Sequence, residues 1–195
     1  MDLDLIRQEV AASISIKQEV LQDDVLLNQV LALAEHCVAS LRAGGKVIFC
    51  GNGGSFADAQ HLSAEFTSRF MFDRPSLASI ALGTNSSSLT ALGNDYGYEY
   101  VFAREIESIA EPRDVFIAIT TSGNSNNVVN AVNAALKKDV KTVVLTGGNG
   151  GKLGGSVDCI TIPSTSTARI QECHILLGHI VCGLVESTMF EKVSE

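Results

Sequence analysis

A chain of 195 residues with 46% hydrophobic content is long enough for one full-sized domain with a buried core, and no shift of composition divides it, so residues 1–195 are expected to form a single domain. The net charge of -8 and the sequence pI near 5.0 exclude a broad basic surface for nucleic acid or an anionic membrane. The five cysteines are scattered and never spaced C-x-x-C, which argues against disulfides or a zinc knuckle and predicts reduced core residues.

The N-terminal part of the chain predicts two helices ahead of the first strand. Apolar residues recur at helical spacing over residues 2 to about 21, and the pattern continues from Val25 to Leu41, with Gly44 and Gly45 as the C-terminal cap. Their apolar faces can pack against another subunit or against the chain's own sheet. The acidic N-terminus and the lack of any apolar run of membrane-spanning length predict a cytoplasmic protein.

The rest of the chain alternates strand-like and helical segments. The strand-like runs are Val47–Cys50, Ala78–Leu82, Val115–Thr120, Thr142–Thr146 and Cys159–Pro163. This alternation predicts an α/β fold with a doubly wound, mainly parallel sheet of about five strands. Ligands of such sheets bind beyond the carboxyl ends of the strands, so the loops that begin at residues 51, 83, 120, 147 and 163 are candidate binding loops.

The first of these loops, GNGGS, joins the strand at residues 47–50 to a helix that begins near Ser55. Glycines let backbone N–H groups converge, and the helix N-terminus favours an anion such as phosphate, although a tight connection without a ligand is an equal alternative. Phe56 occupies the third glycine position of a dinucleotide fingerprint. In the later GGNGGK run, Leu153 stands where a P-loop needs Ser or Thr, so nicotinamide binding and ATP hydrolysis have little support.

A second loop, between the strand VFIAIT and the helix NNVVNAVNAALKK, gathers hydroxyl groups. They belong to Thr120, Thr121, Ser122 and Ser125, beside Gly123. Ordinary helix capping by Ser125 accounts for only one of them, so the cluster favours phosphate binding. Two such loops at the ends of two parallel strands can hold one ligand from both sides.

The helix after the first loop carries its charges on one stripe. Asp58, His61, Glu65 and Arg69 fall within about 80° of arc at 100° per residue. A solvated face with stabilising ion pairs is one interpretation. The other is functional, because an imidazole and a carboxylate one turn apart can bind a metal or act on a substrate.

The last helix, about Thr167 to Phe190, is apolar on much of its circumference, which predicts that it is buried or lies at an interface. Gln171, His174 and His179 interrupt the apolar sequence, and periodicity alone does not tell which histidine is functional. Earlier in the chain, Asn94-Asp95 follows a short helical run and has the ordinary interpretation of a turn.

In these motifs the chain resembles the sugar isomerase (SIS) family and, within it, the isomerases of phosphorylated seven-carbon sugars. Nearly the whole chain is covered by the ordered blocks LIRQEV, AGGKV, CGNGGS, GNDYG, TSGNS, LTGGNGGK and ARIQE. The resemblance implies a homotetramer of flavodoxin-like subunits with active sites at subunit contacts. It also implies interconversion of sedoheptulose 7-phosphate and D-glycero-D-manno-heptose 7-phosphate, for lipopolysaccharide or related heptose synthesis, through an enediol and without an organic cofactor.

The same resemblance assigns roles position by position. Substrate binding falls to Asn52, Gly53, Gly54, Ser55, Asn94, Asp95, Thr120, Thr121, Ser122, Ser125 and Gln171. The implied zinc ligands are His61, Glu65, Gln171 and His179, and the implied catalytic pair is Glu65 as base and His179 as acid. Thr120 stands in place of a serine and Ala168 in place of an aspartate of some members, whereas His174 has no role in the pattern and is expected in the core.

The chain also resembles non-catalytic SIS regulators, such as the replication-initiation factor DiaA, in ARIQE and RPSLASIAL. A regulator that senses a phosphosugar or binds a partner can keep the phosphate loops. It has no reason to keep both Glu65 and His179, so their presence favours the enzyme.

Overall fold

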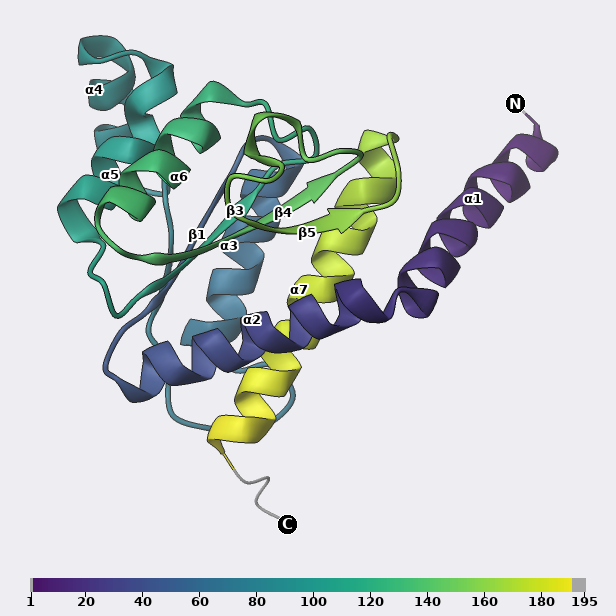
Figure 1. Ribbon diagram of the computed structural model, residues 1–195, viewed down its shortest axis with the longest axis horizontal. Helices are drawn as coiled ribbons and strands as arrows, with labels where there is room; N and C mark the ends of the chain where they lie inside the picture. Colours follow the sequence, from purple (N-terminus) through teal and green to yellow (C-terminus); the bar gives the residue numbers. More distant parts are fainter. Residues whose placement is uncertain (1, 191–195) are drawn as a thin grey trace.

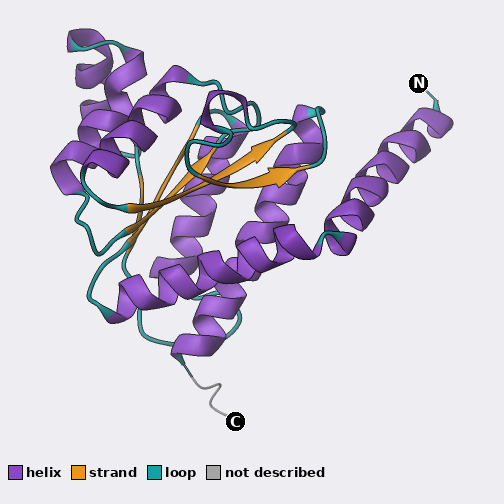
Figure 2. Cartoon of the chain, viewed as in Figure 1, coloured by secondary structure: helices purple, strands orange, loops and turns teal. Residues whose placement is uncertain are grey.

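A computed structural model describes residues 2–190 of the chain (Figures 1 and 2). Its helices are α1 (Leu3–Gln22), α2 (Asp24–Arg42), α3 (Gly54–Thr67), α4 (Ser86–Asp95), α5 (Val101–Ile109), α6 (Asn126–Lys137) and α7 (Thr167–Met189). Its strands are β1 (Val47–Gly51), β2 (Ser79–Ala81), β3 (Val115–Ile119), β4 (Lys141–Gly147) and β5 (Asp158–Ile162). Short 3-10 helices lie at Tyr98–Tyr100 and Gly151–Leu153.

The five strands form one parallel sheet in the order β2-β1-β3-β4-β5, which confirms the predicted doubly wound α/β fold. Side chains alternate between the two faces along each strand, so each face has its own core. Phe49, Ile117 and Leu145 pack under α2, α3 and α7. Helices α5 and α6 cover the opposite face (Figure 1), and Ile48 and Phe116 belong to the core on that face.

Two helix boundaries correct the sequence-based expectations. Helix α3 ends at Thr67, so Arg69 lies beyond the helix that was expected to carry it. At this end Arg74 takes the place of a further helical turn, because its guanidinium donates to the carbonyl oxygens of Phe66 and Ser68. Asn94 and Asp95 form the last turn of α4 rather than a separate turn, and α5 follows before β3.

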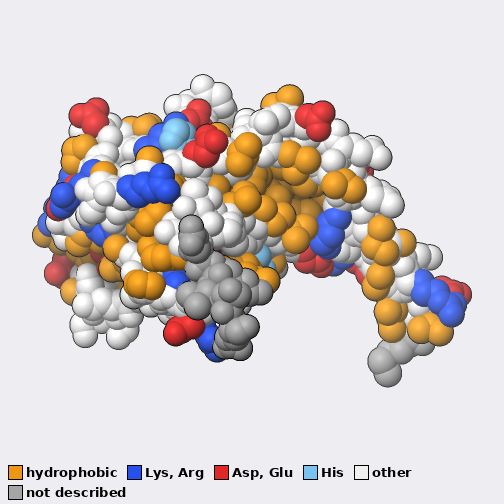
Figure 3. Space-filling model, turned by 90° about the horizontal axis from the view of Figure 1, so that it is seen from below, with side chains coloured by type: hydrophobic (Ala, Val, Ile, Leu, Met, Phe, Trp, Pro, Cys, Tyr) orange, Lys and Arg blue, Asp and Glu red, His pale blue; other side chains and the backbone are white. Residues whose placement is uncertain are grey.

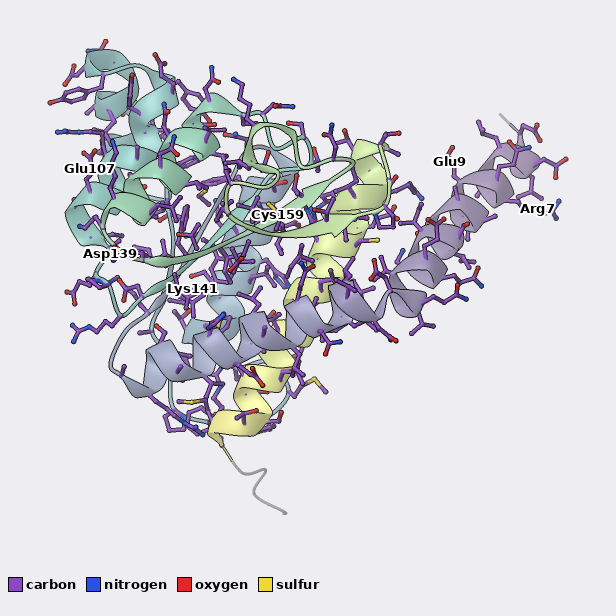
Figure 4. All side chains as sticks on the ribbon, viewed as in Figure 1. Arg7, Glu9, Glu107, Asp139, Lys141 and Cys159 are labelled. Carbon is purple, nitrogen blue, oxygen red and sulfur yellow. The ribbon has the colours of Figure 1, made fainter. Side chains whose placement is uncertain are left out.

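The two N-terminal helices behave differently. Helix α2, capped by the Asp23 carboxylate on the Leu26 N–H at 3.0 Å, packs against the sheet and α7, which is one of the two predicted alternatives. Helix α1 projects away from the sheet, as Arg7 and Glu9 illustrate (Figures 1 and 4), and Val20 is its only buried residue.

Hydrophobic side chains are exposed on this side of the molecule. They include Leu3, Leu5, Ile6, Val10 and Ile14 on α1, Val25 and Leu31 on α2, and Leu176 and Ile180 on α7. Figure 3 shows apolar surface in the angle between the body and the projecting helix. Within residues 2–190, no helix is both long enough and apolar enough to cross a membrane.

The cysteines are all free, and four of them, Cys37, Cys50, Cys173 and Cys182, are buried as predicted. Cys159 differs, because β5 is an edge strand and leaves its side chain half-buried (Figure 4). Burial raises the pKa of the Cys159 thiol, with the charge of Asp158 adding to the effect.

Candidate active site

The two predicted phosphate loops lie side by side at the carboxyl edge of the sheet, because β1 pairs with β3 and Gly51 stands opposite Ile119. Reciprocal amide hydrogen bonds join them. Asn52 Nδ2 donates to Asn127 Oδ1 at 2.9 Å, and Asn127 Nδ2 donates to Asn52 Oδ1 at 2.8 Å. The Tyr98 hydroxyl donates to the same Asn52 oxygen at 3.2 Å. Asn127 is buried, so it fixes the first loop against the start of α6.

Three of the four helices that begin at this edge, α3, α6 and α7, have no side-chain bond from their N-cap residue, and α4 is the exception. Asp2, Asp23 and Asn85 cap α1, α2 and α4 with hydrogen bonds, whereas no side chain caps α3, α6 or α7. Ser125 sits at the cap position of α6 without making the bond that ordinary capping predicts. The Phe56 and Val128 N–H groups already donate within these turns, to the Gly53 carbonyl oxygen and to Asn127 Oδ1. The N–H groups before them in the first turns of α3 and α6 can donate to an anion.

Hydroxyl groups surround these two helix starts. Gly53 has a φ of 56°, which a side chain rarely adopts, and it turns the chain into α3. Ser55 in the first turn is buried, as is Thr120 at the end of β3, while Thr121 and Ser125 are half-buried and Ser122 is exposed. The arrangement can replace water around a phosphate group.

Below the first loop, α3 and α7 bring two imidazoles and a carboxylate together. His61 Nε2 lies 2.8 Å from His179 Nε2 and 3.4 Å from Glu65 Oε1. One ligand atom from each of the three side chains lies within 4.8 Å of the others. His61 and Glu65 share a face of α3 because they are one helical turn apart, and α7 supplies His179.

Gln171 lies between this cluster and the first loop, since a Cβ built on Gly54 would be 3.8 Å from its side chain. Its Nε2 donates to both oxygens of Asp58, at 2.8 and 2.9 Å. Burial raises the pKa of Asp58, while the hydrogen bond from Gln171 and the charges of His61 and His179 act in the opposite direction. Asp58 orients the amide so that the Gln171 carbonyl oxygen is the atom available as a ligand.

The buried Asp58 also shows that the charged stripe of α3 is not a simple solvated face. Sequence reasoning placed Asp58 on this stripe but gave it no role in the site. Its spacing of three residues from His61 was the available signal. Asn127 and Phe70, which stacks on His179 with ring centroids 5.5 Å apart, were missed because their partners come from other elements.

Three other residues lie apart from the cluster. Asn94 and Asp95 are exposed at the end of α4, on the opposite layer, where Asn94 Nδ2 donates to Asp95 Oδ1 at 2.7 Å. His174 is fully buried, and its Nε2 lies 3.0 Å from the carbonyl oxygen of Thr146. The expectation that His174 belongs to the core is confirmed.

Comparisons with known proteins identify the family and the fold. The family model described as SIS domain matches residues 8–147. The phosphoheptose isomerase of Sulfurimonas denitrificans is 47% identical over 186 residues, covering 95% of each chain. The solved phosphoheptose isomerase of Neisseria gonorrhoeae superimposes with a TM-score of 0.87 at 41% identity, covering 94% of this chain and 98% of that one. The enzyme of Francisella tularensis gives a TM-score of 0.91 at 35% identity, covering 96% and 99%.

Proposed function

Because the chain belongs to the SIS domain family and is a phosphosugar isomerase, we propose that its reaction is the conversion of sedoheptulose 7-phosphate into D-glycero-D-manno-heptose 7-phosphate. The observation that carries this proposal is the His61, Glu65 and His179 cluster on α3 and α7, together with the uncapped N-termini of α3 and α6, which the Asn52–Asn127 hydrogen bonds hold together. A phosphate site next to an acid–base pair suits a reaction that moves protons along a phosphorylated sugar.

In the proposed complex, the sugar phosphate lies over the starts of α3 and α6. The first-turn N–H groups and the hydroxyls of Ser55, Thr121, Ser122 and Ser125 donate to the phosphate oxygens. Asn52 and Gln171 then face the sugar hydroxyls. The half-buried positions of Thr121 and Ser125 support this arrangement, since they leave the hydroxyls accessible from the loop side.

Glu65 is the proposed base and His179 the proposed acid. The Glu65 carboxylate removes the proton from the carbon beside the carbonyl, whose electron pair forms the carbon–carbon double bond of an enediol. His179 gives a proton to the carbonyl oxygen in the same step. Glu65 then returns its proton to the neighbouring carbon, and His179 recovers a proton from the hydroxyl that becomes the new carbonyl. Protons and charge balance over the two steps.

The residues present fit a zinc ion. Two imidazole nitrogens and a carboxylate oxygen converge. Because the Gln171 amide nitrogen is engaged by Asp58, its carbonyl oxygen is left as the ligand atom, and His61, Glu65, Gln171 and His179 together are a donor set that zinc accepts. When bound, zinc supplies a Lewis acid that polarises the carbonyl oxygen. Glu65 is proposed both as a zinc ligand and as the base, and a carboxylate held by a metal is a weaker base. Measuring turnover with and without zinc therefore separates these two roles.

We also propose a homotetramer. The support is the apolar surface of α1, α2 and α7, which a single chain leaves exposed (Figure 3). Contiguous exposed apolar patches of this kind mark interaction sites.

The test is incubation of the purified protein with sedoheptulose 7-phosphate, with and without zinc, while the aldoheptose phosphate is followed. The Glu65→Gln variant is expected to lower kcat by about 10³-fold because the base is lost, and to keep phosphosugar binding because the loops are untouched. Glu19→Gln, at an exposed position of α1, is the matched control. Near-normal turnover in Glu65→Gln would refute the assignment of the base. Binding of the phosphosugar without turnover by the unaltered protein, in any condition, would refute the reaction.

A further inference from the structure

The segment that follows α3 returns to the active site along one face of α7. His179, Gly183 and Glu186 are spaced four and three residues apart, so they line the same face of that helix. The Phe70 ring stacks on the His179 ring with a centroid distance of 5.5 Å and an interplanar angle of 19°. A Cβ built on Gly183 would lie 3.4 Å from the Phe70 ring, so a larger side chain there would push the ring away.

Glu186 holds the backbone of this segment in place. Its carboxylate accepts the N–H of Phe70 at 2.9 Å and the N–H of Met71 at 2.6 Å. It also pairs with Arg74 Nε at 3.0 Å, and the two side chains are only 1% and 2% exposed. A buried carboxylate with three donors is fully engaged, so the position of Phe70 is set by α7 itself.

Arg74 connects the same carboxylate to the helix that carries Glu65. Its Nη1 donates to the carbonyl oxygens of Phe66 and Ser68, and its Nη2 donates to the carbonyl oxygen of Glu65 at 2.6 Å. These are the terminal carbonyls that a helix leaves without partners, and a guanidinium there also suits the negative end of the helix dipole. The last turn of α3 is therefore tied to α7 through a buried ion pair.

We infer that Phe70, Arg74 and Glu186 form a clamp that positions the two members of the acid–base pair relative to each other. Arg74 fixes the turn of α3 that bears Glu65, and Phe70 fixes the plane of the His179 ring. This inference rests on the proposed roles of Glu65 and His179. The three residues are positioning residues, since they act through the main chain or the ring plane rather than on the sugar.

Phe70→Leu tests the clamp, because it removes the stacked ring and keeps apolar bulk. We expect kcat to fall about tenfold, the usual cost of losing the support of a catalytic ligand, while KM stays within about twofold because the phosphate loops are unaltered. Phe70→Tyr should restore kcat. Phe72→Leu, two residues further along the same segment and similarly half-buried, is the matched control and should behave like the unaltered protein.

A second measurement reports the stacking of Phe70 on His179 and does not depend on an activity assay. In nuclear magnetic resonance spectra, the stacked Phe70 ring shifts the His179 ring protons upfield. This shift should vanish in Phe70→Leu and persist in Phe70→Tyr and Phe72→Leu. Glu186→Gln, which breaks the ion pair, should lower kcat and weaken the same shift.

The outcomes separate the two proposals. If the unaltered enzyme turns over the substrate and Phe70→Leu matches it in kcat and in the His179 resonances, the clamp is refuted and the proposed function stands. If the unaltered protein shows no turnover, the proposed function fails, and the His179 resonances alone decide the clamp. Should Glu186→Gln fail to fold, the Phe70 variants still decide whether the clamp exists.

Discussion

His174 shows how burial decides the role of a histidine in α7. Its side chain is fully buried, with Nε2 placed 3.0 Å from the carbonyl oxygen of Thr146, so the neutral ring with its proton on Nε2 satisfies that carbonyl. Within residues 2–190, its Nδ1 has no hydrogen-bond partner. Burial lowers the pKa of His174 to about 4, and the hydrogen bond to Thr146 only partly opposes this. The native protein therefore keeps this ring uncharged.

This burial predicts a pH dependence of stability. The unfolded chain protonates His174 below its ordinary pKa of 6.5, whereas the folded chain resists until about 4. The unfolded state thus binds more protons between these values, and the free energy of unfolding should fall as the pH drops from 6.5 towards 4. Urea unfolding at several pH values measures this slope.

His174→Gln removes the titrating ring and should flatten that slope, even if the variant is less stable at every pH. The comparison uses the change with pH and not the absolute stability. An unchanged slope in the variant would show that other groups cause the acid sensitivity.

At the residue scale, the sequence indicated which side chains belong to the candidate site more reliably than which side chains they contact. The helical spacing of His61 and Glu65 was readable because both lie on one helix. Periodicity did not tell whether His174 or His179 is the functional histidine, because that depends on the groups that each ring contacts in the folded chain. His179 meets His61 and Phe70, and His174 meets the carbonyl of Thr146, all from other elements.

At the scale of elements, the paired amides of Asn52 and Asn127 join the first loop to α6. We expect Asn127→Ala to leave the Asn52 amide without its partner and to loosen the loop, which should raise KM about tenfold for a loss near 1.4 kcal/mol. The effect on kcat should be smaller, because Glu65 and His179 are untouched. Steady-state kinetics measure both constants.

Asn133→Ala is the control for this prediction. Asn133 also lies on α6, but at an exposed position nearly two turns beyond Asn127. If Asn127→Ala and Asn133→Ala raise KM equally, the paired amides have no special part in holding the loop.

The elements themselves were largely predictable. Continuous apolar runs such as Val115–Ile119 are fully buried parallel strands, as predicted, and the loops that begin at residues 51 and 120 follow the carboxyl ends of neighbouring strands. The end of α3 was not predictable, because Arg74, which bonds its terminal carbonyl oxygens, lies seven residues beyond its last residue, Thr67. The capping state of Ser125 was also out of reach, since a serine before a helix normally makes the capping bond.

At the scale of the whole molecule, α1 packs on the core only near its end, through Ile16 and Val20, and earlier along the helix it bonds its own chain through polar groups. Ser13 Oγ donates to the Glu172 carboxylate at 2.7 Å, and Arg169 Nη1 donates to the Glu9 carbonyl oxygen at 2.9 Å. Its apolar side chains at Leu3, Ile6, Val10 and Ile14 remain exposed. Spacings of three and four place them on one stripe that suits a second copy of the helix.

The double variant Val10→Glu/Ile14→Glu should therefore dissociate the proposed homotetramer. Charges in an apolar interface are costly, so the mass measured by light scattering after size-exclusion chromatography should fall at micromolar concentration. Gln8→Glu/Ser15→Glu adds the same charge on exposed positions away from the stripe and should leave the mass unchanged. A full-sized assembly in the first variant would show that the stripe is not the contact.

Neither the direction of α1 nor the choice between the two alternatives for the N-terminal helices was readable from the sequence. Apolar periodicity predicts that one face of a helix is covered, but it does not tell whether the same chain or another subunit covers it. The alternative of a non-catalytic regulator is set aside for a different reason, because relatives that share 47% identity over nearly the whole chain are isomerases.

The projecting helix also has a consequence for motion. Most of the stability of a helix in a protein comes from packing of its apolar face, and in its own chain α1 buries only Val20. In the proposed homotetramer other subunits supply that packing, so the amide hydrogens of α1 should exchange with solvent at a rate that rises as the protein is diluted and the assembly dissociates. The amides of β3, enclosed on both faces, should exchange slowly at every concentration. Hydrogen-exchange protection of α1 would then depend on the protein concentration, whereas that of β3 in the same polypeptide would not.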